Sequence, residues 1–189
     1  MNHPNCASWL PDQRMALQNH WTHFLVSLGI IWLSCGISAI AQTNALGRPT
    51  GEVILTISGK ISKTNHDQTA DFDLAMLNAL RHRKTETSTP WTKGKPTFEG
   101  PLLSELLDSV GCTGSQLRVV ALNDYTTTIP VEDARKWPVI LATHMNGTPM
   151  TVRQKGPLFV IYPFDEYPKL YNEMYFFRSA WQVRQIDIR

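Results

Sequence analysis

The sequence has little cysteine and no histidine cluster. Its 189 residues include three cysteines, of which Cys6 and Cys35 fall in an N-terminal segment that we expect to be removed. Cys112 would then stand alone, so the mature chain could form no internal disulfide. His66 and His144 have no second ligand at the spacing of a metal site, and we expect both to be structural or exposed. The sequence therefore predicts neither a disulfide framework nor a histidine metal site.

Strong charge of either sign is also missing. The formal net charge is +2, and the longest basic run is Arg81-His82-Arg83-Lys84. Nucleic-acid-binding domains usually carry an extended basic patch, so we expect no nucleic-acid partner. A run this short is typical of exposed surface. The sequence is 42% hydrophobic and 10% aromatic, which indicates a globular core rather than disorder.

One long apolar run is present, at residues 24–40. It leads into Ala39 and Ala41, whose spacing is that of the small residues read by signal peptidase. We therefore predict a signal peptide over residues 1–41, cleaved after Ala41. Cleavage there would place the mature protein in the periplasm.

Two alternatives concern the same segment. The positively charged part of the predicted signal is weak, which makes Met15 a second candidate for the start of translation. An uncleaved membrane anchor is the competing interpretation, because the apolar run is only slightly shorter than a comfortable membrane span. In either case residues 42–189 are long enough to form one domain without covalent staples.

The pattern of apolar residues after the leader predicts six or seven strands and two short helices. The clearest strands lie at residues 52–61, 117–122, 137–145, 156–163 and 181–188. Helical spacing predicts helices at residues 69–80 and about 101–111, and Asn146-Gly147 is typical of a hairpin turn. Because strands and helices are segregated, we predict an α+β fold with a mostly antiparallel sheet and two short helices.

Three local expectations follow from this assignment. Val53, Leu55 and Ile57 should share one buried face of the first strand. The first helix should use Phe72 and the apolar residues that follow it at helical spacing, and the basic run at residues 81–84 should close it. Residues 85–89 should form a strand that leads into an open loop carrying Trp91.

Taken in order, the motifs of the chain resemble those of the oxidoreductase molybdopterin-binding domain, which has the sulfite oxidase fold. The resemblance covers residues 53–188, and its specificity lies in the order and spacing of the motifs. They are Thr89-Pro90-Trp91, Phe98-Glu99-Gly100-Pro101-Leu102-Leu103, Ala121-Leu122-Asn123-Asp124-Tyr125 with Ile129-Pro130, Met145-Asn146-Gly147, Gly156-Pro157-Leu158, Tyr162-Pro163, and Arg178 with Trp181. The resemblance implies this fold and a pterin-type cofactor.

The metal ligand of the resembled enzymes is missing. Those enzymes hold molybdenum through a cysteine on the strand before the Trp91 region, where residues 85–89 of this chain read Thr-Glu-Thr-Ser-Thr. Hydroxyl groups are poor replacements for a soft thiolate, and Cys112 follows the second predicted helix, which is the wrong place. We therefore expect no bound metal and no catalytic residues. The alternative is an oxidoreductase that holds molybdenum or tungsten through another residue.

The organic part of the cofactor could still bind. A pterin is a flat, polar bicycle, so its site needs an aromatic face and an amide or carboxylate for the donor-acceptor edge. The resemblance implies that Arg178 lies near a cofactor, where it would contact a phosphate or the ring. The predicted site comprises Trp91, Asn123, Asp124, Tyr125, Arg178 and Trp181. We expect Asp124→Ala or Arg178→Ala to weaken pterin binding by about tenfold or more and to leave folding intact.

Each of these residues also has a structural alternative. Asn123-Asp124 is typical of a turn after a strand. The two tryptophans could belong to the core. Arg178 could form a surface ion pair with Asp165 or Glu166.

Three functions are consistent with the sequence. The first, implied by the resemblance, is an exported pterin-binding sensor or adaptor that acts on a membrane-bound enzyme of cyclic di-GMP signalling. The acidic and aromatic loop at residues 164–171 would then be a candidate contact surface for the periplasmic part of that partner. The second is a molybdopterin-dependent oxidoreductase with an unusual metal ligand. The third is an interaction module without a ligand.

Overall fold

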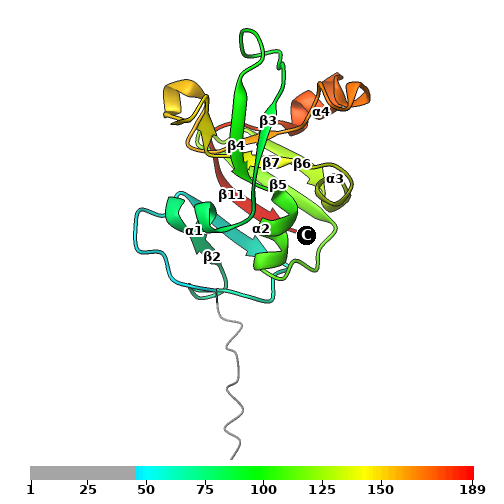
Figure 1. Ribbon diagram of the computed structural model, residues 1–189. Helices are drawn as coiled ribbons and strands as arrows, with labels where there is room; N and C mark the ends of the chain where they lie inside the picture. The colour runs from blue at the N-terminus through cyan, green and yellow to red at the C-terminus, as the bar shows by residue number, and fades with distance from the viewer. Residues whose placement is uncertain (1–45) are drawn as a thin grey trace, which may run out of the picture. The chain divides into compact units, whose positions relative to one another are not determined.

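The computed structural model describes residues 46–189, and the predicted signal peptide lies outside the described residues. Figure 1 shows the arrangement of the elements. The strands are β1 (Leu55–Gly59), β2 (Ala70–Phe72), β3 (His82–Glu86), β4 (Thr97–Pro101), β5 (Gln116–Ala121), β6 (Thr126–Pro130), β7 (Ile140–Ala142), β8 (His144–Met145), β9 (Thr148–Pro149), β10 (Phe159–Ile161) and β11 (Val183–Ile188). The helices are α1 (Leu74–Ala79), α2 (Leu103–Ser109), α3 (Val131–Lys136), α4 (Glu173–Arg178) and the 3-10 helices η1 (Val152–Gln154) and η2 (Pro168–Leu170).

The largest sheet has five strands in the order β2-β1-β11-β5-β6. β1 and β11 run parallel, and the other neighbouring pairs are antiparallel. The register of β11 against β5 shifts between Val183 and Gln185, which explains the imperfect alternation of the C-terminal strand. Leu55 and Ile57 are buried as predicted, but Val53 precedes β1 and is exposed, so that part of the prediction was wrong.

Two smaller sheets complete the fold. One has the order β3-β4-β8-β9 and the other pairs β10 with β7, all antiparallel. The predicted Asn146-Gly147 turn joins β8 to β9, with φ angles of 52° and 77°, which asparagine and glycine adopt most readily. The predicted strand at residues 137–145 is divided between β7 and β8. The buried strand around Phe159–Ile161 is confirmed as β10.

The first helix is shorter than predicted. Phe72 belongs to β2, and α1 begins only after Asp73, whose side chain accepts a hydrogen bond from the Met76 N–H at 2.8 Å. An N-cap of this kind fixes the start of a helix more strongly than apolar spacing does. The basic run at residues 81–84 does not close α1, because most of it lies in β3.

The second predicted helix is confirmed as α2, and Gly111 follows it with a φ of 62°. The prediction of two helices was incomplete, because α3 and α4 are further α-helices of the described chain. Both have six residues, too few to show a helical repeat of apolar positions. None of the helices in residues 46–189 is long and apolar enough to cross a membrane.

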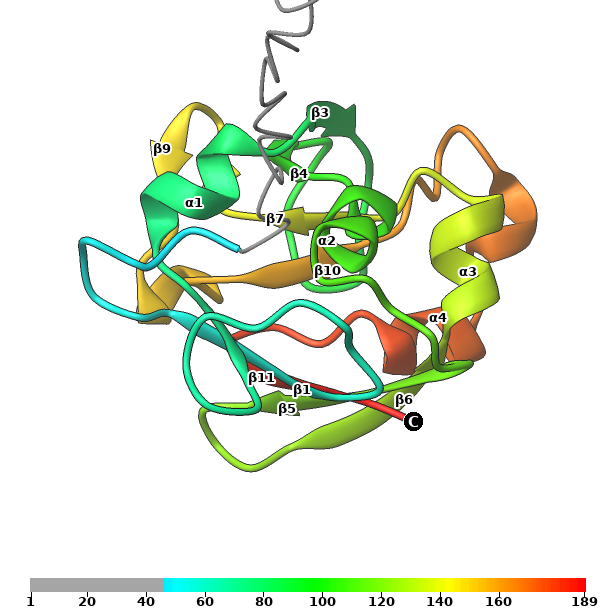
Figure 2. The ribbon, with the colours of Figure 1, turned by 90° about the horizontal axis from the view of Figure 1, so that it is seen from below.

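The core consists of two clusters. The larger joins the five-stranded sheet to α2, whose Leu103, Leu106 and Leu107 are buried against it. In Figure 2, β1, β5, β6 and β11 run together along the lower side, and α1, α2 and α3 lie above them. The smaller cluster gathers Phe98, Phe159 and their neighbours from β4, β7 and β10. Trp91 and Trp181 pack against this smaller cluster while remaining partly exposed, which leaves part of each ring for a neighbouring site.

Candidate functional site

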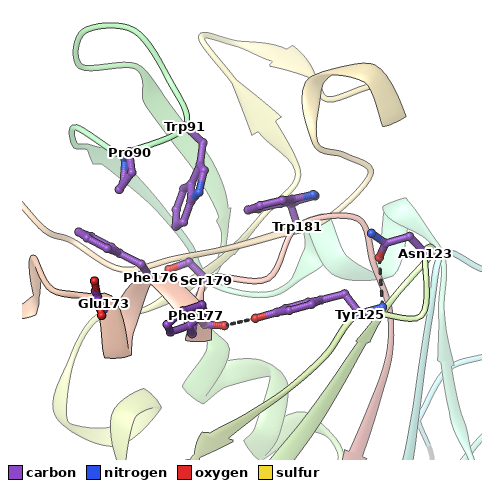
Figure 3. A pocket seen from close by; sticks show the side chains of 9 residues that line it. All are labelled: Pro90, Trp91, Asn123, Tyr125, Glu173, Phe176, Phe177, Ser179 and Trp181. Carbon is purple, nitrogen blue, oxygen red and sulfur yellow. Dashed lines mark hydrogen bonds between the residues drawn. The ribbon is translucent and has the colours of Figure 1, made fainter.

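A cavity of about 320 Å³ opens beside the smaller cluster. Its walls come from the loop after β3, the β5–β6 loop, α4 and the segment before β11 (Figure 3). Trp91, Asn123, Tyr125 and Trp181, four of the six residues predicted for the site, line it. The full lining is Pro90, Trp91, Asn123, Tyr125, Glu173, Phe176, Phe177, Ser179 and Trp181.

Aromatic rings form most of the wall. The centroids of Trp91 and Trp181 are 5.4 Å apart at an interplanar angle of 62°, and those of Trp91 and Phe176 are 5.9 Å apart at 80°. These edge contacts hold the rings at fixed angles without stacking them on one another. The Lys155 ammonium lies 4.5 Å from the centroid of Trp181, a cation–π contact that further orients this ring.

The β5–β6 loop brings Asn123 and Tyr125 to the cavity. The Asn123 Oδ1 accepts a hydrogen bond from the Tyr125 N–H at 3.2 Å, and Asp124 between them has a φ of 64°. The predicted turn is therefore present. Within the described chain the Asn123 side-chain NH₂ donates no hydrogen bond, so it is available to a ligand. The Tyr125 hydroxyl donates to the Phe177 carbonyl at 2.9 Å, which links the loop to α4.

Asp124 lies next to the cavity without lining it. Its side chain is 83% exposed and pairs with the Arg184 guanidinium at 2.7 Å. Its neighbours Asn123 and Tyr125 do line the cavity.

Arg178 is also directed elsewhere. Its Nη1 donates to the Asp133 Oδ2 at 2.8 Å, and the Tyr162 hydroxyl donates to the same oxygen at 2.8 Å. Burial and the neighbouring carboxylate raise the pKa of Tyr162 above its usual range, so the hydroxyl stays protonated as a donor. The Arg178 guanidinium also lies 5.2 Å from the Tyr175 ring centroid.

The predicted surface partners of Arg178 were wrong. Asp165 pairs with Lys95 at 2.9 Å, and Glu166 pairs with Arg83. The pair between Asp165 and Lys95 lowers the pKa of the Asp165 carboxyl, chiefly through the hydrogen bond from the ammonium. Both acids therefore anchor the loop after β10 to the β3–β4 hairpin.

Sequence reasoning missed the wall that α4 contributes. Glu173, Phe176 and Phe177 line the cavity from this helix, which the sequence pattern did not predict. The signal that could have found it is Asn172, whose side chain accepts the Met174 N–H at 3.1 Å and caps the helix. An asparagine followed at once by an acid is a signal for the start of a helix.

The residues at the expected metal position do not suit molybdenum. Thr87 is buried, and its hydroxyl accepts the Asp165 N–H at 3.1 Å. The Thr89 hydroxyl shares a hydrogen bond with Thr92 at 2.8 Å. Both hydroxyl groups are hard oxygen ligands that already form hydrogen bonds within the protein. Molybdenum in this kind of site needs a soft thiolate ligand.

Cys112 offers no substitute ligand. Its sulfur lies 3.8 Å from the Gly114 carbonyl, and its backbone forms a bridge with Ile61, away from the residues that line the cavity. Residues 46–189 contain no group of three or more cysteine, histidine or acidic side chains placed to hold a metal ion.

Comparison with known proteins identifies the family. The model of the oxidoreductase molybdopterin-binding domain matches residues 61–167, more than half of the chain. The chain belongs to this family. Its match ends before α4, so the family model covers Trp91 and the β5–β6 loop but not the helical wall of the cavity.

One solved structure shows the same fold. The sulfane dehydrogenase SoxCD from Paracoccus pantotrophus superposes with a TM-score of 0.51 at 18% identity, over 71% of this chain and 37% of that chain. The present chain thus spans little more than a third of that protein. No curated protein matches. The α+β, sulfite-oxidase-like fold is confirmed, and membership of the molybdopterin-binding family suggests a pterin-type ligand.

Proposed function

We propose that this protein is an exported, non-catalytic pterin-binding sensor or adaptor. The observation that carries the proposal is the cavity walled by Trp91, Trp181, Tyr125 and Phe176 in a domain of molybdopterin-binding type. Concave sites lined mostly by aromatic rings, with a few polar groups, are typical of small-molecule binding.

The chemistry of the cavity matches a pterin. A bicyclic ring can contact indole or phenyl faces, and the free NH₂ of Asn123 can donate to a ring carbonyl or nitrogen. The walls are held by hydrogen bonds and ring contacts within the protein, such as that from Tyr125 to the Phe177 carbonyl. A preformed site of this kind loses little conformational entropy when the ligand enters.

The proposal that the protein is non-catalytic rests on the side chains available as metal ligands at residues 85–89. A redox site of the enzyme type would hold its metal by a thiolate there, whereas the Thr87 hydroxyl accepts a hydrogen bond from the Asp165 N–H. An oxidoreductase using some other ligand is the alternative. No feature of the described residues favours it.

The sensor part rests on α4, which has two faces. Glu173 and Phe176 face the cavity, and Met174 lies outside it and is 48% exposed. Phe177 belongs to both faces, because it lines the cavity and is 65% exposed. Apolar residues exposed at one place are typical of a contact surface. A ligand that fixes α4 would therefore change a surface that a partner could touch. We propose the periplasmic part of a membrane-bound enzyme of cyclic di-GMP signalling as that partner.

Export remains part of the proposal. If residues 1–41 are a signal peptide, the protein recovered from the periplasm should begin at Gln42. Intact-mass measurement of the purified protein checks this. A mass that includes residues 24–40 would favour the membrane anchor instead.

The experiment that tests the proposed function is a combined metal and small-molecule analysis of the protein purified from the exported fraction. A metal-free pterin released in equimolar amount is the expected result. Stoichiometric molybdenum with a phosphorylated pterin would favour the oxidoreductase, and an empty protein that binds no added pterin would favour the interaction module. The control is Val53→Ala, which alters an exposed apolar side chain outside the cavity and should leave the released pterin unchanged.

A further inference from the structure

The residues that line the cavity include a carboxylate and no cation. This combination narrows the class of pterin that can bind, and the inference drawn from it rests on the proposed function. We infer that the site takes a pterin without a phosphate group, and that Glu173 binds its 2-amino-4-oxo edge.

None of the described residues that line the cavity is lysine, arginine or histidine. The nearby cations have other partners. Arg178 pairs with Asp133 at 2.8 Å, Arg184 pairs with Asp124 at 2.7 Å, and Lys155 lies over the Trp181 ring. A phosphate in the cavity would therefore lose its hydration without gaining an ion pair, and it would be repelled by Glu173.

Glu173 is the first residue of α4. Unlike the acids that anchor neighbouring loops, it forms no ion pair or side-chain hydrogen bond with any residue in the part of the chain that the structure describes. In Figure 3, Glu173 and Asn123 lie at opposite ends of the cavity, with the aromatic side chains between them. A flat ligand lying along the aromatic wall would thus meet an acceptor at one end and an amide donor at the other.

The edge of a pterin matches this order of groups. Its N3–H and 2-amino group are adjacent donors, and a carboxylate can accept from both at once in a charge-assisted pair. The nitrogens of the second, pyrazine ring lie farther from this edge and are acceptors suited to the Asn123 NH₂ at the other end of the cavity. Guanine carries the same pair of donors. A contact with Glu173 therefore identifies this edge without distinguishing a pterin from a guanine, so the test must compare ligands of both ring systems.

The test is a titration of the purified chain, followed by quenching of tryptophan fluorescence. Four ligands are compared: neopterin, neopterin monophosphate, the lumazine that carries the same side chain as neopterin and has an oxygen in place of the 2-amino group, and guanosine. We expect neopterin to bind at least about tenfold more tightly than its monophosphate and lumazine, the factor that one charge-assisted hydrogen bond supports. Guanosine binding equal to that of neopterin would overturn the pterin assignment and retain only the edge.

Glu173→Gln should weaken neopterin binding about tenfold and narrow the gap between neopterin and its monophosphate. Glu132→Gln is the matched control, because Glu132 is also an acid in the first turn of a six-residue helix but lies outside the cavity. Equal affinity for neopterin and its monophosphate, or wild-type affinity in Glu173→Gln, overturns the inference and leaves pterin binding standing. Failure of all four ligands to bind overturns the proposed function itself.

Discussion

The Asp133 carboxylate holds two donors on one oxygen, the Arg178 guanidinium and the Tyr162 hydroxyl, each at 2.8 Å. Both charged side chains are largely buried, with 19% of Arg178 and 11% of Asp133 exposed. Removal of one partner from such a pair leaves a poorly solvated charge. We therefore expect Arg178→Ala to lower the free energy of unfolding by about 3 kcal/mol, as measured by urea denaturation.

Arg184→Ala is the control for this prediction. Arg184 pairs with Asp124, whose side chain is 83% exposed, and surface pairs of this kind contribute less than about 1 kcal/mol. A loss in Arg178→Ala as small as that in Arg184→Ala, below about 1 kcal/mol, would contradict the assignment of Arg178 to a buried structural pair. The sequence prediction that Arg178→Ala leaves folding intact would then be retained.

A second prediction at the residue scale concerns Asn123. Asn123→Asp keeps the oxygen that accepts the Tyr125 N–H and replaces the free NH₂ by a second acceptor. We expect this variant to keep its melting temperature and to bind a pterin at least about tenfold more weakly, because a donor to the ligand is exchanged for a negative charge. The control is Asp124→Asn, which changes the next residue, outside the cavity, and should bind a pterin within about twofold of the wild-type affinity. Equal pterin affinity in the two variants would show that Asn123 is not part of the site.

At the scale of elements, Asp73 connects the start of α1 to the segment before β1. Its carboxylate accepts the Met76 N–H and also the backbone N–H groups of Thr50 and Gly51, at 2.7 and 2.8 Å. These hydrogen bonds, that from Met76 first, lower the pKa of Asp73. A lowered pKa in the folded state means that the carboxylate stabilises the fold above about pH 4 and stops doing so as the pH falls through the folded-state pKa.

Asp73→Asn should therefore flatten the acid limb of the stability curve. The expected result is a smaller fall in the denaturation midpoint between about pH 5 and pH 2 than in the wild type, measured by circular dichroism. Some slope should remain, because the pKa values of Asp108 and Asp165 are also lowered by their ion pairs. An unchanged slope in Asp73→Asn would show that its hydrogen bonds do not persist in solution.

Elements defined by local chemistry could be predicted from the sequence. The Asn146-Gly147 turn, the buried run at Phe159–Ile161 and α2 depend on residues close together in the chain, and all three are present. α3 and α4 could not be found in the same way, because six residues are too short for an apolar repeat. They are stabilised by tertiary contacts instead, such as the ion pair that joins Asp133 of α3 to Arg178 of α4.

At the scale of the whole molecule, the site was predictable only in part, because its walls come from segments more than 80 residues apart. Trp91, Asn123, Tyr125 and Trp181 were predicted from motifs, and the fold brings them together around one cavity. Asp124 and Arg178 belong to the same motifs, but neither lines the cavity. Asp124 pairs with Arg184, and Arg178 pairs with Asp133. Sequence order fixes which loops meet, whereas the direction of a charged side chain depends on which opposite charge the fold places beside it.

Ligand binding should couple these distant walls. A pterin between Trp91, the β5–β6 loop and α4 would contact three segments that the fold connects through ring contacts and the hydrogen bond from Tyr125 to Phe177. A ligand that binds only the folded state at about 100 times its Kd adds about 2.7 kcal/mol of stability. For a domain of this size that corresponds to a rise of about 5–10 °C in the melting temperature.

The rise should increase with the logarithm of the pterin concentration, as measured by differential scanning calorimetry, and Trp181→Ala should lose most of it. The calorimetric transition should remain single, because a ligand that contacts all three walls stabilises them as one unit. A rise in melting temperature that is as large in Trp181→Ala as in the wild type, or a transition that splits in two, would mean that the cavity is not where the pterin binds. The proposed route from ligand through α4 to a partner would then lose its physical basis.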